Sequence, residues 1–377
     1  MKGKLKDFFE LNPTQNTNRH KDFINYIDTA SVENGVLTNI EFLSCNFPSR
    51  AQRIVKYDDI LYSTVRPNLR HYYHYRKNYD HLVASTGFVL IRNKNAENYS
   101  TRFLFYYLSS NSVVKHLSNI AELSQSTFPS FSPKDLGKID LPELTIEKQT
   151  KIASILSAYD ELIENNNKRI KILEQIAENL YKEWFVRFRF PGYETAEFEN
   201  GIPKEWKVVR VKNCLKRLPF NRLCKQDELE SSGKVIVIDQ SSNEFMGFHN
   251  NEPSHYASFE DPIILFGDHS CKFVLMTKNF SLGENVVPFR SINTEELDNY
   301  YLYYAVHKLI VTEEYKRHWG RFTAMKFFKP QINLQKKFAE FVKQLVHKKE
   351  MLWIQNQNLI KQRDLLLPRL MSGKLEV

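Results

Sequence analysis

Two long segments that lack helix breakers and carry apolar residues on a heptad repeat constrain this chain most. Residues 146–186 contain neither Gly nor Pro, and their apolar side chains recur in alternating steps of four and three. A second segment repeats Phe or Leu at every seventh position from Phe338 onward. A heptad stripe is buried only when it packs against another helix. The sequence therefore predicts two long paired helices, over 146–190 and 332–377.

The two helices are expected to pair antiparallel, with Asn166 facing Asn356 as a polar layer that sets the register. In that register Trp184 meets Phe338, and the remaining apolar layers also coincide. Arg363 falls in an imperfect layer, where its charged end is expected to snorkel outward. The alternative is a looser bundle in which Asn166 faces solvent.

The rest of the chain is predicted to form two mixed α/β segments, over 1–145 and 191–331. In the first, strands are expected near 59–65 and 87–92, with a helix over 101–116. Fragments of the two segments match in the same order, among them FLFYYL with YLYYAV and GFVLIR with NVVPFR. This order favours an internal duplication, although any two α/β domains share fragments of this kind. The predicted fold class is α+β, with two similar globules, two long antiparallel helices and a pseudo-two-fold repeat.

Composition and missing motifs narrow the function. The formal charge of +9 favours a polyanionic partner, although the charge alone is weak support. The four cysteines form no CxxC pair, which indicates free thiols in a cytoplasmic protein. No P-loop, HExxH or GxSxG motif occurs, so we expect no catalysis, no metal and no cofactor in this chain. A nuclease or methyltransferase built from scattered carboxylates is the enzymatic alternative.

Several stretches resemble a known family. LPELTIEKQTKIASILSAYDELIENNNKRIKILEQIAENLYKEWFVRF resembles the central spacer of specificity subunits from type I restriction–modification systems, and LLLPRLMSGKLEV is similar to their C-terminal spacer. YSTVRPNLR, ASTGFVLIR, GIPKEWKVVRVKNC and FGDHSCKFVLMTKNFSLGENVVPF resemble segments of their target-recognition domains. The resemblance covers nearly the whole chain, and its spacer motifs are the most specific part.

The resemblance implies that 1–145 and 191–331 are target-recognition domains, each reading one block of a split, asymmetric DNA site. It implies as partners double-stranded DNA, two modification subunits and restriction subunits, with no membrane. S-adenosylmethionine then belongs to the modification subunit, and ATP and Mg to the restriction subunit. The alternatives are a specificity subunit of a modification-only or other multisubunit methyltransferase system, and a coiled-coil scaffold that binds DNA without sequence preference.

In the first domain, the expected DNA contacts follow a strand and surround Pro67. Arg reads guanine and Asn reads adenine in the major groove; the alternative is a solvated loop that touches only phosphates. A tyrosine beyond this loop either stacks on bases or packs in the core, and a polar loop before Pro129 either touches base edges or only connects. The candidate residues are Ser63, Thr64, Arg66, Asn68, Arg70, Tyr73 and Gln125.

In the second domain, the corresponding segment carries Asp268, His269 and Lys272. Asp accepts a hydrogen bond from cytosine N4, and Lys meets guanine or phosphate; the alternative for Asp268 is a turn cap. A basic cluster precedes the second long helix and is expected to anchor phosphates, with a solvated face as the alternative. Its members are Arg317, Arg321 and Lys326.

Overall fold

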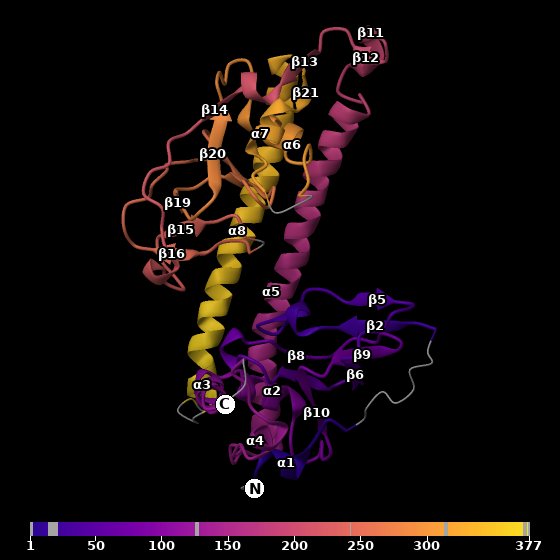
Figure 1. Cartoon of the computed structure of the whole chain (residues 1–377), viewed down its shortest axis with the longest axis vertical. Helices are drawn as coiled ribbons and strands as arrows, with labels where there is room; N and C mark the ends of the chain where they lie inside the picture. The colour runs from indigo at the N-terminus through magenta and orange to yellow at the C-terminus, as the bar shows by residue number, and fades with distance from the viewer. Residues whose placement is uncertain are drawn as a thin grey trace. The chain divides into compact units, whose positions relative to one another are not determined.

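The computed structural model describes residues 3–13, 22–124, 128–241, 243–312, 316–371 and 375. The chain divides into two compact units, which are described separately. Unit 1 consists of Met1–Asn165 and Asn356–Val377, and unit 2 is Asn166–Gln355. Each unit therefore combines one globule with a part of both long helices (Figure 1).

The globule of unit 1 contains two four-stranded sheets. One has the order β1-β10-β7-β8 and is antiparallel throughout, and the other has the order β5-β2-β9-β6 with a parallel β2–β9 pair. Its elements are α1 (Leu5–Phe8), β1 (Phe9–Leu11), β2 (Ile24–Ile27), β3 (Val32–Glu33), β4 (Val36–Leu37), β5 (Glu41–Leu43), β6 (Ala51–Ile54), β7 (Ile60–Ser63), β8 (Tyr72–His74), β9 (Leu82–Ser85), β10 (Phe88–Asn93), α2 (Thr101–Ser109), α3 (Asn111–Glu122) and α4 (Pro133–Gly137).

The globule of unit 2 repeats this topology. Its sheet β14-β20-β17-β18 matches β1-β10-β7-β8 strand for strand, and β16-β15-β19 matches β5-β2-β9, again with one parallel pair. Its elements are β11 (Phe198–Glu199), β12 (Ile202–Pro203), β13 (Lys207–Arg210), β14 (Leu215–Arg217), β15 (Val235–Ile238), β16 (Gly247–His249), β17 (Ile263–Gly267), β18 (Phe273–Met276), β19 (Phe280–Leu282), β20 (Val286–Ser291), α6 (Asn299–Val306), α7 (Trp319–Ala324) and β21 (Lys326–Lys329).

The predicted duplication is confirmed, because every matched fragment occupies the same element in both globules. GFVLIR and NVVPFR form β10 and β20, and FLFYYL and YLYYAV lie in α2 and α6. Even an ion pair is repeated. Arg92 of β10 pairs with the buried Asp59 at 2.6 Å, and Arg290 of β20 pairs with Asp261 at 2.5 Å.

The single helix expected over 101–116 is wrong in detail, because the structure has two helices there. Ser110 adopts an extended backbone, with φ −63° and ψ 146°, and separates α2 from α3. Its hydroxyl donates a hydrogen bond to the carbonyl of Tyr107, so the side chain satisfies an acceptor in the last turn of α2. Ser competes in this way for backbone groups at helix ends.

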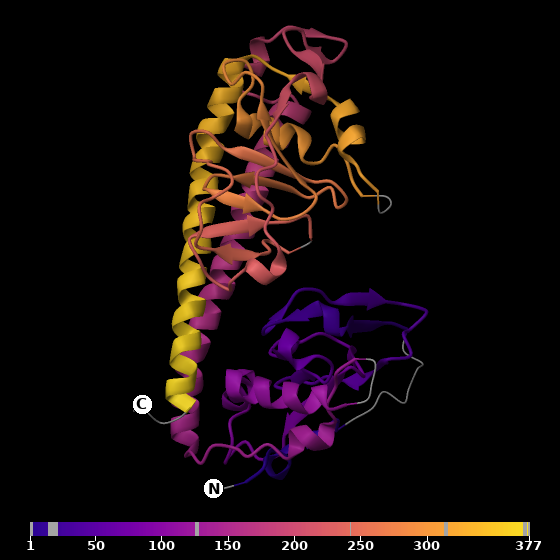
Figure 2. The ribbon, with the colours of Figure 1, turned by 60° about the vertical axis from the view of Figure 1, so that its left-hand side comes forward.

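The two long helices are α5 (Ile146–Tyr181), which continues as a π-helical turn at Lys182–Val186, and α8 (Ile332–Met371). Figure 2 shows them side by side within unit 2. There the ring centroids of Trp184 and Phe338 lie 6.1 Å apart, as the antiparallel register predicts. In unit 1, Ile152 of α5 joins the same core cluster as Leu370 of α8. The antiparallel coiled coil is thus confirmed within each unit.

A buried glutamine joins each globule to the long helix that follows it. Gln149 of α5 accepts from the amide of Ser100, the N-cap of α2, and donates to the carbonyls of Asn98 and Leu144. In unit 2, Gln335 of α8 makes the matching three bonds, to Asp298, Glu296 and Pro330. Both glutamines are fully buried, and this joint was not anticipated from the sequence.

Asn166 and Asn356 are both buried, with 4% of each residue exposed. This burial contradicts the alternative in which Asn166 faces solvent. The Asn166 Nδ2 donates to Gln355 Oε1 at 3.2 Å. Direct pairing of the two asparagines joins residues of different units and stays a prediction.

We expect the double variant Asn166→Leu, Asn356→Leu to raise the melting temperature. A buried amide layer costs stability that two leucines recover, and Gln355 is exposed, so water satisfies its freed amide. Thermal unfolding followed by circular dichroism of the full chain measures the change. A lower melting temperature for the double variant would count against this view of the layer.

Candidate nucleic-acid interfaces

The connection between β7 and β8 forms a tightly held loop in unit 1. It contains a 3₁₀ turn at Pro67–Leu69, and the residues on both sides, Arg66 and Arg70, have positive φ angles of 47° and 57°. Non-glycine residues rarely adopt this left-handed region, and such strain concentrates at functional sites. The backbone amide of Arg66 is bound to the carbonyl of Pro129 at 2.8 Å, which fixes the loop to a second segment.

Two of the predicted contact residues are presented outward by this loop. Arg66 and Asn68 are exposed, as is Leu69 at 48%. The guanidinium of Arg66 lies over the ring of Phe128, 5.0 Å from its centroid. A planar cation held on an aromatic face is preorganised to meet a base edge or a phosphate.

The other candidates in unit 1 are engaged by the protein itself. The hydroxyl of Ser63 donates to the carbonyl of Val65, and that of Thr64 donates to the carbonyl of Gly87. Tyr73 is half-buried in β8, and burial raises its pKa to about 12, which favours packing over stacking on bases. Gln125 lies outside the described residues.

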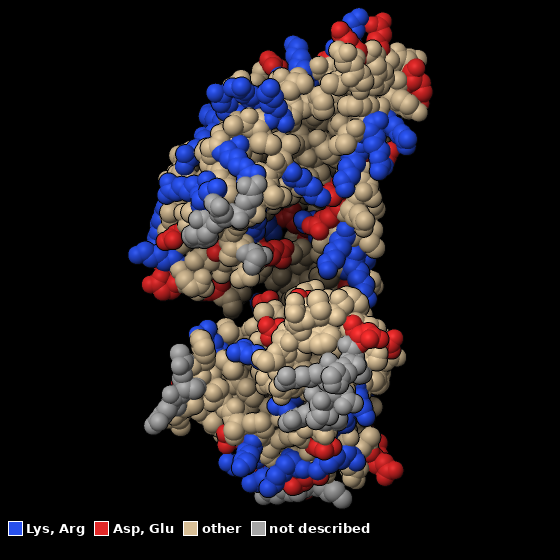
Figure 3. All heavy atoms as spheres, turned by 45° about the vertical axis from the view of Figure 1, so that its right-hand side comes forward, with Lys and Arg blue, Asp and Glu red and all other residues tan. Residues whose placement is uncertain are grey.

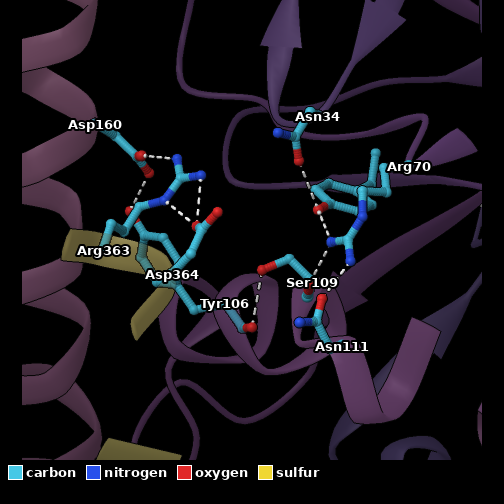
Figure 4. Close-up of polar contacts among 9 residues, drawn as sticks. Asn34, Arg70, Tyr106, Ser109, Asn111, Asp160, Arg363 and Asp364 are labelled. Atoms are coloured by element: carbon cyan, nitrogen blue, oxygen red, sulfur yellow. Dashed lines mark hydrogen bonds and ion pairs between the residues drawn. The ribbon is translucent and has the colours of Figure 1, made fainter. Parts of the chain in front are cut away.

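Arg70 closes the loop against the end of α2. Its guanidinium donates to the carbonyl of Ser109 at 3.0 Å, to the hydroxyl of Tyr72 at 3.2 Å and to the side chain of Asn111 (Figure 4). The Tyr72 hydroxyl in turn donates to Asn34. These bonds give Arg70 a role in shaping the loop, whereas Arg66 is the arginine that points outward.

The equivalent loop of unit 2 connects β17 and β18. The carboxylate of Asp268 accepts from the backbone amides of His318 and Trp319 at 3.0 and 2.8 Å, and so caps the start of α7. Only 14% of its side chain is exposed. The geometry therefore favours the capping interpretation of Asp268, with the cap on a helix instead of a turn.

Lys272 and His269 tie this loop to the segment after β15. The ammonium of Lys272 donates to the carbonyls of Asn243 and Asp239, and burial lowers its pKa. The backbone amide of His269 donates to the side chain of Gln240 at 3.1 Å. The loop is thus anchored on both sides by its own residues.

The basic residues predicted near α7 are all exposed, with Arg317 at 79% of its side chain. Arg321 donates to the carbonyl of Val311 at 3.4 Å, and Lys326 lies on β21 opposite Arg210. Figure 3 shows many Lys and Arg side chains on the surface of this unit, on its upper-left margin and on its right-hand side. Such a surface suits phosphate contacts.

Sequence reasoning missed a further member of this surface. Arg217, the last residue of the edge strand β14, lies 4.4 Å from the ring centroid of Phe220 and 5.9 Å from that of Trp319. It therefore joins the edge of the sheet to α7, next to the helix start that Asp268 caps. The signal was present in the stretch KRLPFNR, which interleaves basic and aromatic residues.

A buried polar cluster was also missed. Arg363 was expected to snorkel outward, but its side chain is only 16% exposed and pairs with Asp160 at 2.6 Å and with Asp364 at 2.9 Å. The hydroxyl of Tyr106 donates to the second oxygen of Asp160 (Figure 4). The expectation failed because Asp160 of α5 and Asp364 of α8 supply carboxylate partners beside the imperfect layer.

The described part of the chain contains no group of three or more His, Cys, Asp or Glu arranged to hold a metal ion. Within the same residues, no helix has both the length and the apolar character needed to span a membrane.

The known proteins that this chain resembles are specificity subunits of type I restriction enzymes. The family model of the type I restriction modification DNA specificity domain matches residues 1–175. The specificity subunit of type I restriction enzyme HindI from Haemophilus influenzae is 34% identical over 46% of this chain, and the match spans only 39% of that protein. The specificity subunit of type I restriction enzyme MjaIX from Methanocaldococcus jannaschii is 28% identical over 74% of the chain and 69% of its own length.

One solved structure shows the same fold. The S subunit of a type I restriction–modification system from M. genitalium superposes with a TM-score of 0.56 at 15% identity, covering 98% of this chain and 95% of that one.

Proposed function

Because the chain belongs to the family of type I restriction–modification specificity subunits, we propose that it is the non-catalytic DNA-recognition subunit of such a complex. In this proposal it reads a bipartite, asymmetric site, one block with each globule. It lends this specificity to an adenine-N6 methyltransferase.

The observation that carries the proposal is the presence of two structurally equivalent loops with different sequences. The β7–β8 loop and the β17–β18 loop occupy the same place in the repeated sheet. The first presents Arg66 and Asn68, whereas the second lies beside Arg217 and the exposed Arg317 and Arg321. Because base readout depends on the side chains presented, two such loops are suited to two different blocks of sequence.

Partners follow from the same proposal. Besides double-stranded DNA, they are two modification subunits, which hold S-adenosylmethionine, and restriction subunits, which hold ATP and Mg. Apolar side chains that remain exposed on the long helices support docking of other proteins; in unit 2 they include Ile172, Ile176 and Met351, each about half exposed. The complex would act on chromosomal DNA in the cytoplasm.

The test is to express the chain with its modification subunit and to map N6-methyladenine across the host genome. We expect two short, different blocks that flank a fixed gap. A continuous site, or methylation without sequence preference, would refute the proposal and favour the scaffold alternative.

A separate preparation, without the modification subunit, tests the enzymatic alternative. The purified chain alone, given S-adenosylmethionine or Mg²⁺, should neither methylate nor cut DNA. Turnover that disappears when one of its own carboxylates is replaced would show that the chain is an enzyme.

A further inference from the structure

A buried polar cluster connects the C-terminal helix to the globule of unit 1. Asp160 of α5 uses both carboxylate oxygens: one pairs with Arg363 of α8 at 2.6 Å, and the other accepts from the Tyr106 hydroxyl of α2 at 2.5 Å. Arg363 is held in place by a second contact, to Asp364. Three helices therefore meet at one carboxylate (Figure 4).

The cluster is a fixed arrangement of charges. Burial, reinforced by the charge of Asp160, raises the pKa of Tyr106, so its hydroxyl stays protonated and remains a donor. The side chain of Asp160 is 27% exposed. Loss of Arg363 would leave that carboxylate without its cation, and a poorly compensated charge of this kind rearranges or draws in water.

The same turn of α2 also contacts the β7–β8 loop, whose residues 66–70 form the proposed recognition loop. The hydroxyl of Ser109 donates to the carbonyl of Tyr106 at 2.9 Å, and the carbonyl of Ser109 accepts from Arg70 at 3.0 Å. Unsatisfied carbonyls at a helix C-terminus attract cations. The last turn of α2 therefore contacts α5 through Tyr106 and the recognition loop through Arg70.

We propose that Arg363 is a positioning residue for the recognition loop at 66–70, acting through Asp160 and the last turn of α2. Helix α2, which carries both contacts, is held rigidly in the core, because its residues Phe103, Leu104 and Leu108 are fully buried. A shift at Asp160 therefore moves the carbonyl that Arg70 holds, and with it the exposed Arg66. This inference rests on the proposed function, since it concerns which DNA block the loop reads.

The described residues of the second globule contain no equivalent of this cluster. When the helices are aligned on their matching glutamines, Gln149 and Gln335, the position of Arg363 corresponds to Ala177. There the end of α6 is tied to α5 by a different pair, His307 and Glu178, at 3.0 Å. Loss of Arg363 is therefore expected to disturb recognition of the first block, which is the DNA block read by the globule of unit 1. Recognition of the second block, read by the globule of unit 2, should stay intact.

The experiment uses the full chain with its modification subunit and a library of DNA duplexes randomised in both blocks. We expect Arg363→Gln to reduce discrimination in the first block about fivefold and to leave the second block unchanged, and we expect Arg363→Lys to retain most of the discrimination. Lys349→Gln is the matched control, because Lys349 forms an exposed pair with Glu174 between the same two helices in unit 2. Equal losses in both blocks, or no loss in either, would overturn the inference.

A double-mutant cycle separates positioning from a general loss of stability. Arg363 and Arg70 do not contact each other, so the effects of Arg363→Gln and Arg70→Gln would add if the residues acted independently. We expect the double variant to discriminate between sequences in the first block no worse than the more impaired of the two single variants. Additive losses would contradict the proposal.

Hydrogen exchange provides a readout that does not depend on methylation. The amides of Leu69 and Arg70 bond within the loop, to the carbonyls of Arg66 and Pro67. They should exchange faster in free Arg363→Gln than in the wild type or Lys349→Gln, and unchanged protection would overturn the inference. Asp160→Asn serves in its place if Arg363→Gln does not fold. If wild-type methylation proves not to be bipartite, the proposed function fails while this exchange result still decides the positioning role.

Discussion

Replacing Phe338 with alanine should lower the free energy of unfolding by about 3–5 kcal/mol, the usual cost of removing a fully buried aromatic ring. Phe338 has no exposed surface, and its ring centroid lies 5.2 Å from that of Phe185 and 5.6 Å from that of Tyr304. It therefore connects α8, the end of α5 and α6 in one core. Collapse around the cavity left by the substitution is limited, because the neighbouring rings belong to two other helical segments, the end of α5 and α6.

Urea unfolding of the full chain, followed by circular dichroism, measures this loss. Phe341→Ala is the matched control, since Phe341 lies one turn away and is 56% exposed. Its edge contact with Trp184 is worth about 0.5–1.5 kcal/mol. If both substitutions cost the same, the junction at Phe338 does not carry the stability assigned to it.

The second large effect concerns recognition. Arg66→Ala should reduce discrimination in the first block by about 5- to 150-fold, which corresponds to the roughly 1–3 kcal/mol of a bidentate base contact. Asn68→Ala should act on the same block, because both side chains leave the same 3₁₀ turn. Competition between DNA libraries randomised in one block at a time measures each effect.

Lys148→Ala separates readout from loss of charge. Lys148 is exposed on α5 in the same unit, so its removal changes the net charge equally without altering the loop. We expect it to leave discrimination between sequences unchanged. If Arg66→Ala weakens binding to all sequences alike, Arg66 contacts phosphate and the base contact must be assigned elsewhere.

The pairing of the long helices was predictable from sequence because a heptad pattern is local and repeats many times. The duplication was also predictable, since several weak matches in one order, such as GFVLIR with NVVPFR, require the same succession of elements. Ser110 was missed because its effect depends on a single backbone conformation. The glutamine joints were missed because no sequence pattern distinguishes Gln149 and Gln335, and two of the three partners of each lie 37 to 51 residues away.

The recognition loops show where sequence reasoning ends. Arg66 and Arg70 have the same chemistry and flank the same proline, yet only Arg66 points outward. Arg70 is hydrogen-bonded to Ser109, which lies 39 residues later in the sequence. Asp268 is hydrogen-bonded to His318, which lies 50 residues later. Partners at such distances are set by the tertiary fold, so the sequence identified the loops but could not assign a role to each side chain.

The composition of the two units has a consequence for synthesis on the ribosome. Unit 2 is one continuous stretch, Asn166–Gln355, whereas unit 1 needs both ends of the chain. Leu367 and Leu370 complete a core that begins with Leu5, so the globule translated first acquires these core residues only after all of unit 2 has been synthesised. Domains usually fold in the order of their synthesis; here the core of the N-terminal globule stays incomplete until Leu367 and Leu370 have been synthesised, after unit 2 has all of its residues.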